Sequence, residues 1–153
     1  METTKQIREE LVLIYTIDGL SFGLPLSSVE RIVRSVTVTP LPDAPNTILG
    51  VIIVQGRIIP VVNMRLKLRL RSRAVSIKDK FIIAGTGNLM VVLVADEVEG
   101  VVKRPLEKVA TGEEADAWMK SLEGIVKLDD VPVPIHNLDC FLSEEAVSYS
   151  DAD

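Results

Sequence analysis

Few residues of this chain have the types and spacing that catalysis or metal binding requires. His136 is the single histidine and Cys140 the single cysteine, and no paired carboxylate, second thiol or second imidazole lies near either one to complete a nucleophile–base pair or a zinc site. We therefore interpret His136 as structural and Cys140 as a buried, inert thiol. An enzyme built on these two residues would need them to converge with a carboxylate in the fold.

The other segments that resemble reactive sites are weaker. Gly85-Thr86-Gly87-Asn88 lacks the Lys-Ser/Thr pair of a phosphate-binding loop and joins two strand-like segments, so it is predicted to be a turn. The acidic pairs Asp96-Glu97 and Asp129-Asp130 are typical of solvated turns when no further ligands accompany them. The sequence thus predicts a protein without catalytic residues, metal sites or cofactors.

Composition indicates a β-rich fold. Hydrophobic residues make up 47% of the 153 residues but aromatic residues only 4%, so the core must consist mainly of Val, Ile and Leu, which pack well in sheets. The length favours one domain, or two small modules that share a core. About ten short strands separated by turns predict an all-β sandwich or barrel.

The expected elements follow from alternation and turn residues. The hairpin at Gln55-Gly56 and a second one at Asp129-Asp130 are candidates for analogous halves. Serines before Val29–Val33 predict a short helical turn there, and early acidic residues with a late lysine predict a connecting helix over Glu113–Leu122. The predicted strands are Leu11–Ile17, Leu20–Leu24, Ile48–Val54, Arg57–Leu68, Lys80–Ala84, Leu89–Ala95, Val98–Lys103, Gly124–Leu128 and Val131–Ile135.

The longest apolar run, Leu89–Ala95, is much shorter than the roughly 20 residues of a membrane-spanning helix. The N-terminal residues METTKQIREE contain no apolar signal core. These features predict a cytoplasmic protein that does not insert into a membrane.

Charge is distributed unevenly along the chain. Residues 1 to 80 carry 12 Lys/Arg and 7 Asp/Glu, a net charge of +5, whereas residues 81 to 153 carry 5 and 15, a net charge of −10. If the strand after residue 57 continued, five cations at odd positions would share one face: Arg65, Lys67, Arg69, Arg71 and Arg73. Such a face fits a solvated edge, an acidic protein partner or a nucleic-acid groove, although the segment lacks aromatic residues for base stacking.

A series of motifs from about Glu10 to about Glu144 resembles the CheW-like coupling proteins of bacterial chemotaxis. Its centre is Thr39–Leu70, where a proline-rich loop leads to Gly50 and to a hairpin that continues into Ile58–Arg65. Further matching segments are Leu11–Leu24, Val29–Ile32, Val94–Val98, Leu122–Ile125 and Val133–Leu142.

The resemblance implies an all-β domain over residues 10–144, made of two intertwined SH3-like five-stranded barrels with short connecting helices, followed by a flexible acidic tail at 145–153. It also implies a non-catalytic adaptor at membrane-associated receptor arrays, which joins the cytoplasmic tip of a methyl-accepting chemoreceptor to the regulatory domain of a CheA-type histidine kinase. A β-barrel module that binds nucleic acid through Arg65–Arg73 is the alternative. The candidate partner-binding residues are Val29, Arg31, Gly50, Gln55, Gly56, Arg57, Arg65 and Gly124.

This chain departs from the pattern of the family at charged positions. Gln55 stands where an arginine is usual, Asn63 where an aspartate is common, and Arg31 where an acidic residue is frequent. Arg57 could replace the missing positive charge only if the hairpin let it reach the same partner. The departures predict a specialised paralogue, for example of a pilus-motility or another alternative chemosensory pathway.

Overall fold

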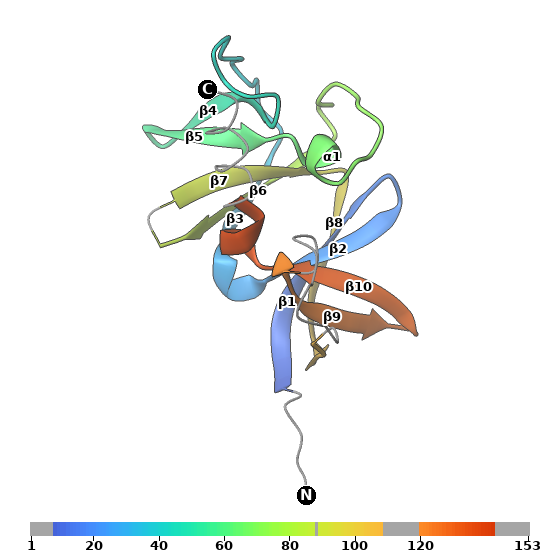
Figure 1. The fold of residues 1–153 in the computed structure, drawn as a ribbon. Coiled ribbons are helices and arrows are strands. Elements are labelled where there is room, and N and C mark those ends of the chain that lie inside the picture. Colours follow the sequence, from blue (N-terminus) through green and yellow to red (C-terminus); the bar gives the residue numbers. More distant parts are fainter. Residues whose placement is uncertain (1–7, 88, 109–119, 143–153) are drawn as a thin grey trace, which may run out of the picture. The chain divides into compact units, whose positions relative to one another are not determined.

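Two five-stranded sheets make up the computed structural model, which describes residues 8–87, 89–108 and 120–142 (Figure 1). One sheet has the strand order β8-β1-β2-β10-β9 and the other β3-β6-β7-β5-β4. The strands are β1 (Arg8–Ile17), β2 (Leu20–Pro25), β3 (Val29–Arg34), β4 (Ile48–Val54), β5 (Arg57–Val62), β6 (Lys80–Thr86), β7 (Leu89–Ala95), β8 (Glu97–Leu106), β9 (Leu122–Leu128) and β10 (Val131–His136). The predicted all-β fold with two five-stranded units is confirmed.

The chain crosses four times between two compact units. Unit 1 comprises residues 1–15, 21–27 and 99–153, and unit 2 comprises residues 16–20 and 28–98. Each unit contains a parallel strand pair, β10 with β2 in unit 1 and β5 with β7 in unit 2. Unit 1 therefore draws its sheet from both ends of the chain, whereas unit 2 is nearly continuous in sequence.

Aliphatic side chains dominate both cores, as the composition predicted. Burial alternates along β3, whereas Val12–Tyr15 of β1 and Phe81–Ala84 of β6 are buried on both faces of their strands. The core of unit 2 is built around Ile52, Ile59, Val61, Phe81, Ile83 and Val92. The core of unit 1 is built around Val12, Ile14, Val126, Val133 and Ile135.

The two predicted hairpins are equivalent parts of the two units. β4 and β9 share one pattern of burial, and so do β5 and β10. The segment that precedes each hairpin forms an antiparallel bridge with its first strand. The bridge joins Thr39 to Val51 in unit 2 and Glu107 to Ile125 in unit 1. The repeat provides an internal comparison, because a feature present in one hairpin and absent from the other is not required by the fold.

Two predicted elements are wrong. The expected helical turn at Val29–Val33 is strand β3, whose side chains alternate in exposure and which pairs with β6, while the preceding Leu26–Ser28 forms a short 3-10 helix. The expected strand Arg57–Leu68 ends at Val62, because the Asn63 side chain accepts a hydrogen bond from the Leu66 N–H and starts the one-turn helix α1 (Met64–Lys67). The five cations from Arg65 onward consequently do not share a strand face.

Smaller corrections concern single residues. Cys140 is exposed rather than buried, because its turn, which begins at Asn137, leaves it on the solvent side. Most of the helix predicted at Glu113–Leu122 and the whole tail 145–153 lie outside the described residues. Among the described residues, no helix is long and apolar enough to cross a membrane.

Candidate partner-binding surface

Strand β3 and the β4–β5 turn bring several of the predicted residues together in unit 2. Arg31 Nη2 donates a hydrogen bond of 3.2 Å to Gln55 Oε1. Arg57 Nη2 contacts both carboxylate oxygens of Glu30, at 2.8 and 3.1 Å. We call Glu30, Arg31, Gln55 and Arg57 the polar quartet. Val29 adjoins it at the start of β3.

A tight turn holds one half of the quartet. Gln55 and Gly56 have positive φ angles of 50° and 80° and connect the paired residues Val54 and Arg57. Two successive left-handed residues are typical of the two-residue turn that suits the twist of a hairpin, and glycine is the residue that accepts this conformation at least cost. Gly56 is thus explained by the geometry of the turn, which displays Gln55 and Arg57 on either side of it.

The quartet contributes little to stability. The side chains of Arg57 and Glu30 are 45% and 33% exposed, and ion pairs this accessible stabilise proteins by less than about 1 kcal/mol. Both pairs also link β3, one edge of the sheet, to the hairpin at the other edge. Glu30 and Arg57 can therefore exchange their mutual contact for contacts with a partner at little cost to the stability of the fold.

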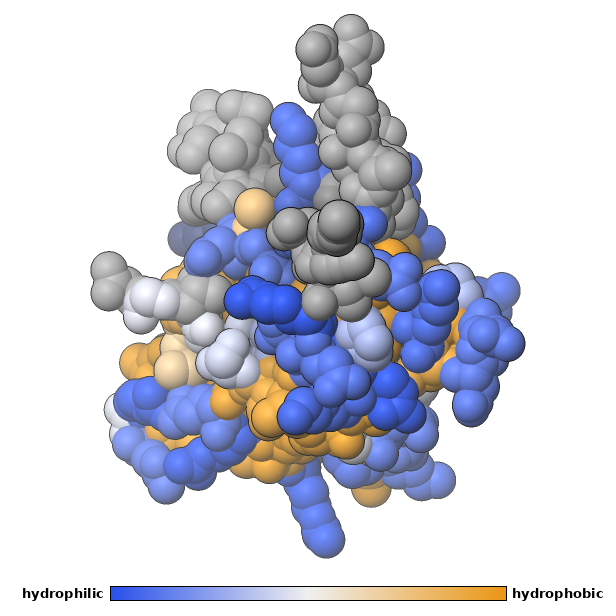
Figure 2. All heavy atoms as spheres, turned by 90° about the horizontal axis from the view of Figure 1, so that it is seen from below, coloured by the Kyte–Doolittle hydropathy of each residue, from blue (hydrophilic) through white to orange (hydrophobic). Residues whose placement is uncertain are grey.

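Two exposed isoleucines lie on the same hairpin. Ile53 and Ile58 are directly opposite each other in the β4–β5 register, and each is 69% exposed. The equivalent pair in unit 1 is Lys127 opposite Pro132. Orange patches on the face drawn in Figure 2 show that hydrophobic residues reach the surface of this protein at several points. At Ile53, the internal repeat shows that a lysine fits the same fold.

Gly50 and Gly124 have roles inside their own units. A Cβ at Gly50 would overlap the backbone carbonyl of Thr39, and the φ angle of 151° disfavours any side chain. A Cβ at Gly124 would lie 2.6 Å from the Glu107 carbonyl oxygen. Both glycines are buried under the bridging segment that precedes their hairpin, so close packing within the chain accounts for them.

Arg65 belongs to an internal ion cluster of unit 2. Its side chain is 12% exposed, with Nη1 2.7 Å from Asp18 Oδ1 and Nη2 2.9 Å from Asp96 Oδ1. Arg73 Nη2 lies 2.7 Å from both Asp79 Oδ1 and Asp96 Oδ1. We call these five residues the arginine cluster. Asp96 is accordingly not the solvated turn residue that the sequence predicted.

The arginine cluster determines the protonation of Asp96. Burial alone would raise the pKa of this carboxyl group, but the hydrogen bond from the Asp18 N–H and the charges of Arg65 and Arg73 outweigh burial and lower the pKa. The guanidinium groups of Arg65 and Arg73 therefore already have anionic partners. This leaves the proposed nucleic-acid face without two of its five cations, and that alternative is not supported.

His136, which the sequence offers as a candidate for catalysis or metal binding, lies in unit 1, outside the arginine cluster and the polar quartet. His136 is buried and packs against Phe22 and Phe141, with ring centroids 5.9 and 4.6 Å apart. Within the described ranges, no three His, Cys, Asp or Glu side chains form a group that could hold a metal ion. The residues around His136 indicate an aromatic core contact of unit 1.

Comparison with known proteins agrees with these observations. Residues 11–146 match the family model of the CheW-like domain. The chain is 28% identical over 141 residues to "Chemotaxis protein CheW" of Thermotoga maritima, covering 92% of this chain and 93% of that protein. It is 26% identical to "Protein FrzA" of Myxococcus xanthus, covering 78% and 75%. The crystal structure of the scaffolding protein TtCheW from Thermoanaerobacter tengcongensis has the same fold, with a TM-score of 0.73 at 24% identity and 90% coverage of both chains.

Proposed function

The chain belongs to the CheW-like domain family, and on this basis we propose that it is a non-catalytic adaptor that couples the cytoplasmic tip of a methyl-accepting chemoreceptor to the regulatory domain of a CheA-type histidine kinase. Proteins of this family act as scaffolding adaptors in chemotaxis and not as enzymes. The proposed place of action is a membrane-associated receptor array. The observation that carries the proposal in this chain is the pair Ile53 and Ile58 beside the polar quartet.

This surface has the composition of a protein-docking site. An apolar centre gains free energy when it is buried, and a polar rim provides orientation and specificity. Ile53 and Ile58 supply the centre, and the quartet supplies charged and amide groups within the same hairpin and the adjoining strand. Because unit 1 folds with Lys127 and Pro132 at the same positions, the isoleucines support a function other than folding.

The quartet also supports a specialised choice of partner. Arg31 and Gln55, two departures from the family pattern, contact each other directly. Where the family pattern leads one to expect an acid on β3 and an arginine on the turn, this chain has an arginine on β3 and an amide on the turn. An acid on β3 and an arginine at the turn are present at neighbouring positions, since Glu30 precedes Arg31 and Arg57 lies two residues after Gln55. A partner that complements this arrangement would bind a conventional family member less well.

Exchange of residues between the two hairpins tests the docking surface. Ile53→Lys introduces the residue that unit 1 carries at the equivalent position, so the fold should tolerate it. We expect binding to the kinase regulatory domain or the receptor tip encoded in the same genome to weaken at least tenfold, the scale of one buried aliphatic side chain. Lys127→Ile is the matched control and should leave the affinities unchanged.

Isothermal titration of the parent and both variants against each partner decides the matter. Weaker binding of one partner on Ile53→Lys alone assigns the hairpin of unit 2 to that partner. Unchanged affinity for both partners would remove this hairpin from the interface. A failure of the parent itself to bind either partner would contradict the coupling function.

A further inference from the structure

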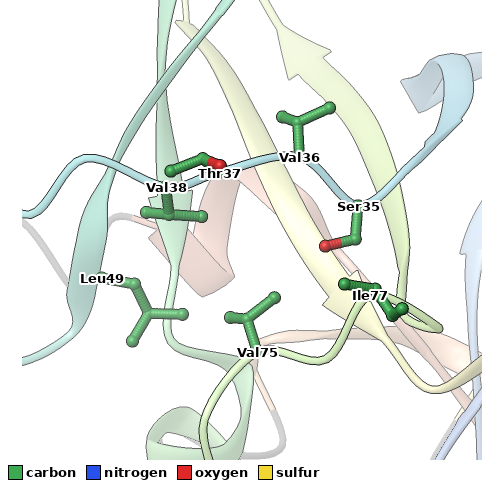
Figure 3. Close-up of a pocket in the computed structure, with 7 residues that line it drawn as sticks. All are labelled: Ser35, Val36, Thr37, Val38, Leu49, Val75 and Ile77. Atoms are coloured by element: carbon green, nitrogen blue, oxygen red, sulfur yellow. The ribbon is translucent and has the colours of Figure 1, made fainter.

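Unit 2 also has a pocket on its surface whose lining includes none of the polar quartet. Its volume is about 510 Å³, and it lies between the segment after β3, strand β4 and the loop before β6 (Figure 3). In Figure 3 the side chains of Val38, Leu49 and Val75 point toward one another across the pocket. The lining is completed by Ser35, Val36, Thr37 and Ile77.

Ile77 forms an exposed apolar edge of this pocket. It is 90% exposed, more than any other large hydrophobic residue among those described. An isoleucine in a disordered loop would lose conformational entropy on binding, and a preorganised one avoids most of that cost. What holds the neighbouring backbone in place therefore decides whether Ile77 can act as an anchor.

Asp79 holds this loop in place. Its side chain is 2% exposed, accepts the Ser76 N–H at 2.8 Å and forms the ion pair with Arg73. The Asp79 N–H donates to the Ser76 carbonyl at 3.0 Å, and the Asp79 carbonyl accepts the Ser35 N–H at 3.2 Å. These bonds close the turn around Ile77 and attach it to the other wall of the pocket.

The charge around the pocket is positive. Arg34 directly precedes the lining residue Ser35, and Lys78 directly follows Ile77. Both are exposed, and neither forms an ion pair within the described part of the chain. Residues 67–80 contain six Lys/Arg and one acidic residue, and that residue, Asp79, is already paired with Arg73.

We propose that this pocket binds an acidic peptide segment of a protein partner, with an aliphatic side chain of the peptide inserted between Val38, Val75 and Ile77 and its carboxylates near Arg34 and Lys78. An acidic peptide is favoured because its charge complements that of Arg34 and Lys78. A single-stranded nucleic acid fits less well because no lining residue is aromatic. An anionic membrane fits less well because the whole chain has a net charge of −5. The inference does not depend on the proposed coupling function.

A random peptide library displayed on phage provides the test. Selection on the full-length protein, with counter-selection on Ile77→Ser, should enrich peptides in which two or more Asp or Glu flank an aliphatic residue. The recovered peptide is then synthesised with a fluorescent label and titrated by anisotropy. Ile77 is so exposed that Ile77→Ser should keep the melting temperature of the parent.

Three variants separate the contributions. Ile77→Ser should weaken peptide binding at least tenfold, and the double variant Arg34→Ser, Lys78→Ser should weaken it and reduce its dependence on salt between 50 and 300 mM NaCl. The control Val131→Ser, Lys103→Ser removes one exposed aliphatic side chain and one exposed cation from unit 1 and should change nothing.

Other results would overturn the proposal. These are the absence of an enriched peptide, enriched peptides without acidic residues, or equal binding to the parent and Ile77→Ser. A labelled dT20 oligonucleotide and phosphatidylserine vesicles are titrated in parallel. Tighter binding of either one, dependent on Arg34 and Lys78, would reassign the pocket to nucleic acid or to lipid.

Discussion

Asp96 has more charged contacts than any other carboxylate in the arginine cluster. It contacts Arg65 and Arg73 and accepts the Asp18 N–H at 2.8 Å. Removal of such a carboxylate leaves two partly buried guanidinium groups and one N–H with a poorer partner. The Asp96 side chain thus connects three segments of unit 2: the turn at Asp18, the helix α1 and the loop before β6.

We predict that Asp96→Asn lowers the free energy of unfolding by about 1 to 3 kcal/mol at pH 7, the range for hydrogen bonds to charged groups in a partly exposed site. The pKa of Asp96 is lowered in the folded state, so its contribution is present above the pKa of the unfolded chain, near 4, and is lost as the pH falls through the lower folded value. Urea unfolding of parent and variant from pH 7 to pH 3 should show a difference that shrinks with acid. A constant difference would mean that the charge of Asp96 is irrelevant.

Gly50 leads to a different prediction for a residue first considered as a partner contact. Gly50→Ala should destabilise unit 2 by about 2 to 4 kcal/mol, because the φ angle is unfavourable and the new Cβ displaces the Thr39 carbonyl from its bond to Val51. Gly56→Ala is the comparison: its φ is also positive, but nothing lies within 4 Å, so the cost should be about 1 to 2 kcal/mol.

Thermal unfolding of both variants measures this difference. If Gly50→Ala is as stable as the parent, the close approach to Thr39 does not explain the glycine. Any loss of partner binding in Gly50 variants should be judged against their stability, since the buried position of Gly50 acts on the fold first.

Among the elements, β3 and the β4–β5 hairpin meet through the polar quartet, and this contact changes what a substitution at Gln55 should do. Gln55→Arg alone brings a second guanidinium group to Arg31 and loses the hydrogen bond of 3.2 Å. We predict that it weakens binding to the cognate partner by less than tenfold. The double variant Arg31→Glu, Gln55→Arg recreates the acid and arginine arrangement typical of the family.

The double variant should bind a conventional receptor tip or kinase domain about tenfold more tightly than the parent does, the scale of a charge-assisted hydrogen bond, and its cognate partner less tightly. Titration of parent, single and double variants against both kinds of partner measures the coupling between the two positions. Additive effects of the two substitutions, or unchanged affinities throughout, would show that the quartet does not determine partner choice.

Alternation and turn chemistry were sufficient to predict most strands, both hairpins and the aliphatic core. They failed where two patterns overlap. The alternating cations and leucines from Arg65 onward also fit a strand, and only the hydrogen bond from the Leu66 N–H to the Asn63 side chain converts their start into a helical turn. Of the candidate surface, the sequence suggested Val29, Arg31, Gln55 and Arg57 but not Glu30 or Ile53. Glu30 was missed because β3 and the β4–β5 turn meet from opposite edges of the sheet, and Ile53 because periodicity does not show how exposed a strand residue is.

The molecule as a whole combines one nearly continuous unit with one that closes over a long stretch of chain. In unit 2, Val61 pairs with Val92, whereas in unit 1 Gly23 pairs with Ile135. Closing the longer loop costs more conformational entropy before any contact is gained. Contacts of greater sequence separation also form more slowly as a rule.

We therefore predict that unit 2 acquires hydrogen-exchange protection first during refolding from urea. Pulse labelling followed by NMR should show protected amides at Ile82 and Val92 in β6 and β7 before Ile135 in β10. Simultaneous protection in both units would indicate a single cooperative step instead.

The parallel pair of β2 and β10 also bears on how the protein is made. Ile135 is synthesised 112 residues after Gly23, which at about 5–20 residues per second takes about 6 to 22 s. During that interval the nascent chain holds β2 without its later neighbour, and an open strand edge is a template for pairing with other chains. We therefore expect rapid overproduction to lower the yield of correctly folded protein, and chaperones that shield β2 to restore it.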